Sequence, residues 1–261
     1  MNDILVKKGA VGITEIFPSP TVKKVIFQIL YPNLFIIENR IGQLQLKIME
    51  KFGESKLILR QQFFLADIGE GETPKMPEKS ESPSRQIWQF HSGDKYALNI
   101  TSKSLDISSN IHKSYNRGDG ENFRDIIKYV LDKFMEDIKI PIIKRIGLRY
   151  QDEMPIFERN NEAMMKYYNT TFDIERFKFE EADAMVFTSA IKRGDYRLNY
   201  RENYRKVGDD WKYTIDFDSY AVDVKPDKYL DVLDKLHEII NIEYNDKITE
   251  KFKEHMRKGA A

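Results

Sequence analysis

A strict alternation of apolar and polar side chains near the C-terminal end constrains this fold more than any other feature of the sequence. Between residues 211 and 218 the apolar set is Trp211, Tyr213, Ile215 and Phe217, and the polar set is Lys212, Thr214, Asp216 and Asp218. Successive side chains of a strand point to opposite faces of its sheet, so the two sets separate. The alternation therefore predicts a sheet with one buried face and one solvated face, which is typical of antiparallel sheets.

Apolar or alternating segments elsewhere predict further strands. They span residues 22–31, 56–66, 85–92, 95–101, 104–109, 142–150, 169–177, 183–193, 195–203 and the remainder of 211–224. Turn sequences separate neighbouring strands at Gly93-Asp94, at Arg193-Gly194-Asp195 and at Gly208-Asp209-Asp210. Such short connections favour hairpins, in which consecutive strands pair antiparallel.

Three segments show the apolar spacing of amphipathic helices. The first spans residues 34–52, and the second carries a continuous apolar stripe from Phe123 to Ile138, with Asp119 as its expected N-cap. The third begins at Pro226-Asp227 and continues to Phe252. Its far end is basic, and we expect it to project from the domain and mediate self-association or docking.

These elements predict an α+β fold with two sheet-containing lobes, largely antiparallel strands, packed helices and a long C-terminal helix. The N-terminal lobe covers residues 1–155 and contains a flexible loop at 68–84, where Gly, Pro, Ser and charged residues replace apolar ones. The C-terminal lobe covers residues 156–261 and is rich in strands.

The composition excludes several classes of function. The 42 basic residues balance 42 acidic residues among 261, so binding to nucleic acid or anionic lipid would need a local patch. Cysteine is absent, which removes disulfides, thiolate metal sites and thiol nucleophiles. The first residues lack the apolar core of a signal peptide, and no apolar run is long enough to cross a bilayer. We expect a cytoplasmic protein without membrane contact or cofactor.

Three parts of the chain resemble an uncharacterised, sporadically distributed prokaryotic protein family. They are SPTVKKVIFQILYP at 19–32, the stretch from Trp88 through Asn110 and Tyr115 to RIGLRY at 145–150, and LDKLHEIINIEYNDKITEKFKEHM at 233–256. The chain departs from the family pattern at Gln151-Asp152, where members have an apolar residue and Asn, and the 68–84 loop resembles an insertion. The patchy occurrence of the family, as seen for mobile or defence-associated genes, implies a partner-dependent role, but the family has no established activity.

Arg145 and Arg149 are the strongest candidates for a ligand site. They share one face of the predicted 142–150 strand, with Gly147 between them. Two guanidiniums beside a bare backbone could bind a phosphate or carboxylate. The alternative is that both arginines pair with acidic residues of a neighbouring element, and the frequency of such pairs favours it.

A second basic set lies in the 195–203 strand and just beyond it. Arg197, Arg201 and Arg205 fall on one face, while Tyr196 and Tyr200 fall on the other. Arginines interleaved with aromatics suggest a surface for single-stranded nucleic acid. The alternation separates the two kinds of side chain, however, which favours buried tyrosines and solvated arginines.

Acidic and histidine residues provide only weak candidates for metal chemistry. Asp216 and Asp218 point to one side and could hold a Mg²⁺-type ion with nearby aspartates, but a solvated sheet face explains them as well. His237 lies beside the apolar stripe of the last helix, as expected of a core or interface histidine. No phosphate loop, G-x-S-x-G sequence or spaced histidine pair is present.

The sequence therefore favours a non-catalytic binding or accessory protein that acts through a protein partner, in a prokaryotic defence or mobile-element context. Two alternatives remain open. One is a nucleic-acid-binding module that uses the arginine faces, and the other is a metal-dependent nuclease or nucleotide-processing enzyme that uses Asp216 and Asp218.

Overall fold

The computed structural model describes residues 12–60, 85–112, 114–118 and 121–259. Two groups of elements follow one another along the chain. The first comprises β1 (Val22–Leu30), α1 (Ile36–Ile48), β2 (Glu54–Arg60), β3 (Arg85–Ser92), β4 (Tyr96–Ile100), β5 (Ser104–Ser109), α2 (Phe123–Asp137) and β6 (Ile143–Met154). The second comprises α3 (Asn161–Tyr167), β7 (Ala184–Arg193), β8 (Tyr196–Val207), β9 (Asp210–Val224), a 3-10 turn (Pro226–Lys228), α4 (Tyr229–Lys247) and α5 (Glu250–Lys258).

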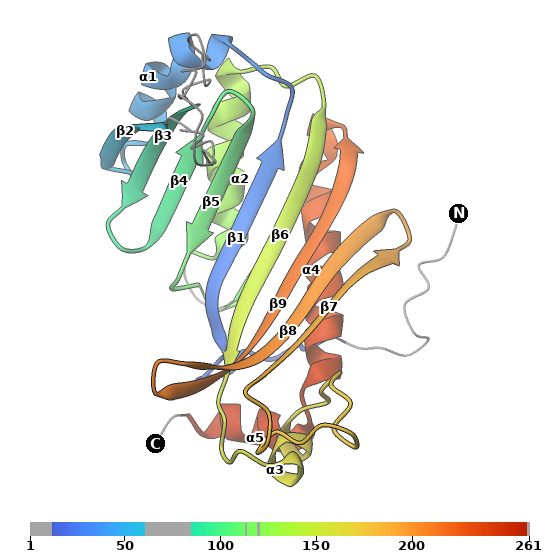
Figure 1. Cartoon of the computed structure of the whole chain (residues 1–261). Helices are drawn as coiled ribbons and strands as arrows, with labels where there is room; N and C mark the ends of the chain where they lie inside the picture. Colours follow the sequence, from blue (N-terminus) through green and yellow to red (C-terminus); the bar gives the residue numbers. More distant parts are fainter. Residues whose placement is uncertain (1–11, 61–84, 113, 119–120, 260–261) are drawn as a thin grey trace, which may run out of the picture.

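All nine described strands belong to one antiparallel sheet with the order β2-β3-β4-β5-β1-β6-β9-β8-β7 (Figure 1). The predicted α+β class with antiparallel strands is confirmed. The strands expected in two lobes nevertheless form a single sheet, because β6 pairs with β1 along one edge and with β9 along the other. The residues on either side of position 155 are thus connected through continuous backbone hydrogen bonding.

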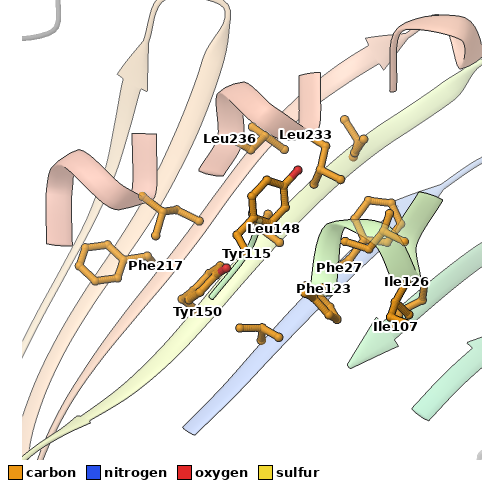
Figure 2. Packing of buried hydrophobic residues seen from close by; sticks show 14 of the residues in the cluster. Phe27, Ile107, Tyr115, Phe123, Ile126, Leu148, Tyr150, Phe217, Leu233 and Leu236 are labelled. Carbon is orange, nitrogen blue, oxygen red and sulfur yellow. The ribbon is translucent and has the colours of Figure 1, made fainter. Parts of the chain in front are cut away.

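Helices α1, α2 and α4 cover one face of this sheet and leave the other face open (Figure 1). The covered face carries Phe27, Leu148 and Phe217, which are completely buried, and α2 and α4 contribute residues such as Ile127 and Leu233 to the same core. Figure 2 shows how rings and aliphatic side chains from the sheet meet those of the helices. The alternation that predicted one buried and one solvated face is confirmed.

Helix α2 has the predicted apolar stripe, and its N-terminus is capped by Asn122, whose Oδ1 accepts from the Asp125 backbone N–H at 3.1 Å. The predicted cap, Asp119, lies outside the described residues. The same is true of the predicted 68–84 loop and of the end of the predicted 56–66 strand, since β2 is described only to Arg60.

The prediction of a strand at 169–177 is wrong, because these residues form a loop between α3 and β7. The carboxylate of Glu202, which is fully buried on β8, explains the loop. It accepts hydrogen bonds from the Thr170 and Thr171 hydroxyls, from the Thr171 backbone N–H at 3.0 Å, and from the hydroxyls of Tyr200 and Tyr213 at 2.7 Å. The threonines bind an acid instead of a neighbouring strand.

The predicted C-terminal helix is present but ends at Lys247, and α5 follows after a break. Ile248 forms an isolated antiparallel bridge with Tyr168, and Thr249 caps α5 by accepting from the Phe252 N–H at 3.3 Å. The segment does not project, because Phe252 and Met256 are completely buried against the rest of the chain. Among the described residues, no helix has the length and apolar character required to cross a membrane.

Truncation on the two faces of the sheet separates core packing from surface contributions. We expect Leu148→Ala to lower the free energy of unfolding by about 2–5 kcal/mol, because it removes a fully buried side chain between the sheet and the helices. The matched change Val222→Ala, on the open face where Val222 is 56% exposed, should cost less than about 1 kcal/mol. Urea unfolding followed by circular dichroism measures both, and equal losses would contradict this assignment of the faces.

Candidate functional site

The open face of the sheet brings together the side chains of the three sites predicted on strands, whereas His237 lies on the covered side. Strand pairing places Arg145, Gly147 and Arg149 of β6 next to the even-numbered residues of β9, and these lie next to the odd-numbered residues of β8. The three predicted sites therefore form one surface, which we call the open face: Arg145, Gly147, Arg149, Arg197, Arg201, Arg205, Asp216 and Asp218.

Arg145 is bound by Asp218 of the neighbouring strand. Its Nη2 donates to both carboxylate oxygens, at 2.7 and 2.9 Å, and its guanidinium lies 4.6 Å from the centre of the Tyr220 ring. Its Nη1 also donates to Gln28 Oε1 at 3.4 Å. The guanidinium is thus held against the sheet by a carboxylate, an amide and an aromatic face.

Gly147 is required by the position of that guanidinium. A Cβ at residue 147 would lie 2.6 Å from Arg145 Nη1 and 3.0 Å from Arg145 Cζ. The bare backbone accommodates the arginine of its own strand, which is a different role from the close approach of an external anion that the sequence suggested.

Arg149 forms the second pair, with Asp216. Its Nε donates to Oδ1 at 2.8 Å and to Oδ2 at 3.1 Å, and its Nη2 also donates to Oδ2. The hydrogen bond to Asp216 raises the pKa of Arg149 above its usual value. The guanidinium of Arg149 is therefore a permanent cation whose charge is offset by a neighbouring carboxylate.

These two pairs join the predicted anion site to the predicted metal site. The arginines proposed to bind an anion and the aspartates proposed to bind a metal bind each other instead, as the alternative interpretation of the arginines anticipated. Within the part of the chain that the structure describes, no group of three His, Cys, Asp or Glu side chains is arranged to hold a metal ion. The geometry therefore favours arginine–aspartate ion pairs over a free anion site or a free metal site.

The basic row on β8 has a different character. Arg197, Arg201 and Arg205 are exposed and alternate with Asn199 and Asn203, and none of the described carboxylates forms an ion pair with them. Tyr200 and Tyr204 point to the buried face, where they are 4% and 0% exposed, as the alternation predicts. The row presents guanidiniums to solvent without the aromatic rings that would stack on bases.

Positive charge dominates this half of the open face. On β6, β9, β8 and β7 the cationic side chains are those of Arg145, Arg149, Lys192, Arg197, Arg201, Arg205 and Lys212. The acidic side chains on the same face are those of Glu153, Asp210, Asp216 and Asp218. Because the strands fix these positions, the excess of cations is a property of the fold and does not require rearrangement on binding.

The other half of the open face is polar but less charged. Gln89 Nε2 donates to Asn99 Oδ1 at 2.6 Å, and Asn99 Nδ2 donates to Asp106 Oδ2 at 2.8 Å. These side chains connect β3, β4 and β5 in one row. Amides that bond across strands order this surface, which also carries Ile26, Ile58 and Ile87.

A second site, which sequence reasoning missed, lies on the covered side of β6. Tyr150, Asp152 and His237 line a cavity of about 100 Å³ between the sheet and α4. Burial raises the pKa of Asp152 to about 7 and lowers the pKa of His237 to about 4. The available signal was an acid at residue 152, on the face of the strand that otherwise carries Ile146, Leu148 and Tyr150.

Comparison with known proteins adds no further assignment. No protein-family model matches the chain, and no curated protein matches it. The resemblance described from the sequence therefore stays a prediction.

Gly147→Ala tests the role of the glycine. We expect the free energy of unfolding to change by less than about 1 kcal/mol, because the clashing atoms belong to the end of a flexible side chain that can move away. The guanidinium of Arg145 should lose its contact with Asp218, which is visible as loss of its slowly exchanging side-chain N–H signals in NMR spectra. Gly42→Ala, at an open position on α1, is the control and should leave these signals unchanged.

The pH dependence of stability tests the two buried groups. Asp152 binds a proton more tightly when folded, since its pKa is about 7 in place of 3.8, so its contribution to stability is lost as the pH rises toward 7. His237 has a pKa of about 4 in place of 6.5, so its contribution increases as the pH rises over part of the same range. These opposing slopes partly cancel in the native sequence.

Asp152→Asn removes the contribution of Asp152 to the pH dependence of stability and leaves that of His237. Relative to the native protein, we expect its free energy of unfolding to rise by up to about 1.4 kcal/mol per pH unit between pH 4.5 and 6.5. Urea unfolding at several pH values provides the measurement, and Asp227→Asn, an exposed acid, is the control. If the free energy of unfolding of the variant changes with pH as that of the native protein does across this interval, Asp152 does not titrate as stated.

Proposed function

We propose that the protein is a non-catalytic binding protein that recognises an acidic protein partner through the basic half of its open face. The observation that supports this most directly is the row of Arg197, Arg201 and Arg205. Three exposed guanidiniums without described acidic partners lie on a sheet face that none of the described helices covers (Figure 1). Arginines held in fixed positions recognise carboxylates well, because each guanidinium presents two parallel N–H donors.

The composition of the face favours a protein over a nucleic acid. Asp216 and Asp218 lie in its middle, where their carboxylates can accept hydrogen bonds from the N–H groups of a protein surface, which a phosphate backbone does not offer. The ring of Tyr220 is occupied by the Arg145 guanidinium, and the rings of Tyr200 and Tyr204 are buried on the other side. A surface that alternates arginine, amide and carboxylate complements a protein surface of mixed but net negative charge.

Metal-dependent nuclease chemistry has less support. Both carboxylates that it would use accept hydrogen bonds from arginines, and a metal ion would have to displace those guanidiniums. A role as a binding partner also accords with the partner-dependent setting that the family resemblance implies.

Defined anionic probes test the proposal. We expect fluorescence anisotropy at about 50 mM salt to show that labelled poly-L-glutamate binds more tightly than a 20-nucleotide oligothymidylate. Arg201→Glu combined with Arg205→Glu should weaken poly-L-glutamate binding at least about tenfold, because it reverses two of the three charges of the row. The control is Lys139→Glu combined with Lys225→Glu, which changes the net charge equally at exposed positions outside the sheet.

Two outcomes would overturn the proposal. Equal weakening by the two double variants would mean that the probes respond only to net charge. Tighter binding of the oligothymidylate, lost in the arginine variant alone, would place the nucleic-acid-binding module ahead of a protein-binding function.

A further inference from the structure

The cavity on the covered side of β6 is separate from the open face and has a different chemistry. It measures about 100 Å³ and lies among β6, α4, the segment 13–22 and the turn at 114–117. Its walls are largely apolar or aromatic, with Ile13, Phe17, Val22, Tyr115, Ile240 and Tyr244 among them. The polar part of the lining includes the Asp152 carboxylate and the Tyr150 hydroxyl, together with the side chains of Glu15, Arg117, His237 and Asn241.

The segment that forms the outer wall is fixed to the domain by polar contacts. The Asn241 side chain accepts from the Ile13 N–H at 3.0 Å and donates to the Ile13 carbonyl at 2.9 Å, and Arg117 donates to the same carbonyl at 2.7 Å. Glu15 pairs with Arg257 through two hydrogen bonds of 2.9 and 2.6 Å. The cavity is therefore bounded by anchored backbone on this side.

Asp152 is a buried carboxylate with few partners. It is 3% exposed, and its Oδ1 accepts one hydrogen bond, from Thr21 Oγ1 at 2.8 Å. No lysine or arginine among the described residues forms an ion pair with it. Glu202, the other buried carboxylate of the sheet, accepts five hydrogen bonds, so the domain is able to satisfy an internal acid completely and does not do so at Asp152.

A second polar group in the cavity lacks any partner. The Tyr150 hydroxyl is buried, and no donor or acceptor among the described residues reaches it. Figure 2 shows Tyr150 with Tyr115 among the core side chains between the sheet and α4. A buried hydroxyl without a hydrogen bond costs about 1–3 kcal/mol, and a ligand that bonded to it from the cavity would remove this cost.

The histidine of the cavity does not supply positive charge. His237 stacks on Tyr115 with ring centres 4.2 Å apart, and its ring centre lies 6.3 Å from that of Tyr150. Because burial lowers the pKa of His237 to about 4, its imidazole is neutral at physiological pH. Arg117, the guanidinium that lines the cavity, donates to the Ile13 carbonyl, and an ionised Asp152 has no ion-pair partner among the described residues.

We propose that this cavity binds the head group of a small primary ammonium compound, with Asp152 as its counter-ion and the Tyr150 hydroxyl as an additional acceptor. An ammonium group donates three hydrogen bonds, which a carboxylate and a hydroxyl oxygen accept. The rings of Tyr115, Tyr150 and Tyr244 add the aromatic faces that attract cations. The cavity is smaller than the roughly 150 Å³ that holds a benzene ring, so it suits a head group with a short alkyl chain.

A divalent metal ion fits the same walls poorly. Calcium and magnesium require six or more oxygen ligands, whereas this cavity offers the Asp152 carboxylate, the Glu15 carboxylate, which pairs with Arg257, and the oxygens of a few hydroxyls and amides. The apolar and aromatic lining likewise favours an organic cation, which loses less hydration energy on entering such a site.

Calorimetric titration with n-propylammonium chloride at pH 8, with n-propanol as the uncharged probe of similar size, tests the assignment. We expect n-propylammonium to bind at least about tenfold more tightly than n-propanol. Asp152→Asn should weaken that binding at least about tenfold, and Tyr150→Phe should weaken it several-fold while keeping the ring. Asp227→Asn, an exposed acid outside the cavity, should bind n-propylammonium as the native protein does.

Other outcomes would overturn the assignment. Equal affinity for n-propanol, or undiminished n-propylammonium binding by Asp152→Asn, would make the cavity an apolar or hydrated space without a charge requirement. No binding at concentrations up to about 100 mM would remove the site. Because the two substitutions preserve size, unfolding curves recorded in parallel distinguish lost binding from lost folding, and neither outcome depends on the partner proposed for the open face.

Discussion

The pairing of β6 with β1 on one side and with β9 on the other is the interaction on which the rest of this structure depends. It unites the N-terminal hairpins with the C-terminal strands, so the chain has one continuous core under one layer of helices. Long-range strand pairing of this kind costs chain entropy, which burial of the apolar face offsets. The opposite face of the sheet is not part of this core, so its side chains determine the chemistry of that surface.

Electrostatics differ sharply between the two sides of that sheet. On the open side, carboxylates and guanidiniums meet in solvent, where each pair contributes little to stability but orders its side chains. On the covered side, a charge has no water to solvate it, so Glu202 requires five hydrogen bonds and Asp152 shifts its pKa. Carboxylates are therefore paired with arginines on the open side, and on the covered side they are either fully hydrogen-bonded or raised in pKa.

Much of the fold was predictable because it depends on local periodicity. The alternation at 211–218 identified the two faces of the sheet, and the stripe from Phe123 to Ile138 identified α2. The errors arose where distant residues decide the outcome. Residues 169–177 have the composition of a strand but bind Glu202, and the C-terminal helix ends where Ile248 bridges to Tyr168.

The site was predictable only in part, for a related reason. Periodicity could place arginines and aspartates on faces, but register decides which of them meet, and register follows from pairings remote in sequence. Arg145 and Asp218 are 73 positions apart. The cavity was harder to predict, since Asp152 becomes a buried carboxylate only when α4 and the segment 13–22 exclude water from it.

Strand β6 carries alternate residues into two unrelated environments, with Arg145 and Arg149 on one side and Tyr150 and Asp152 on the other. A change in the length of this strand by a single residue would exchange the two sets, placing guanidiniums in the core and tyrosine in water. During divergence, substitutions can alter either surface independently, whereas insertions and deletions within β6 would remove both together. The open face and the cavity therefore depend on the same register of β6, although their chemistries have no direct connection.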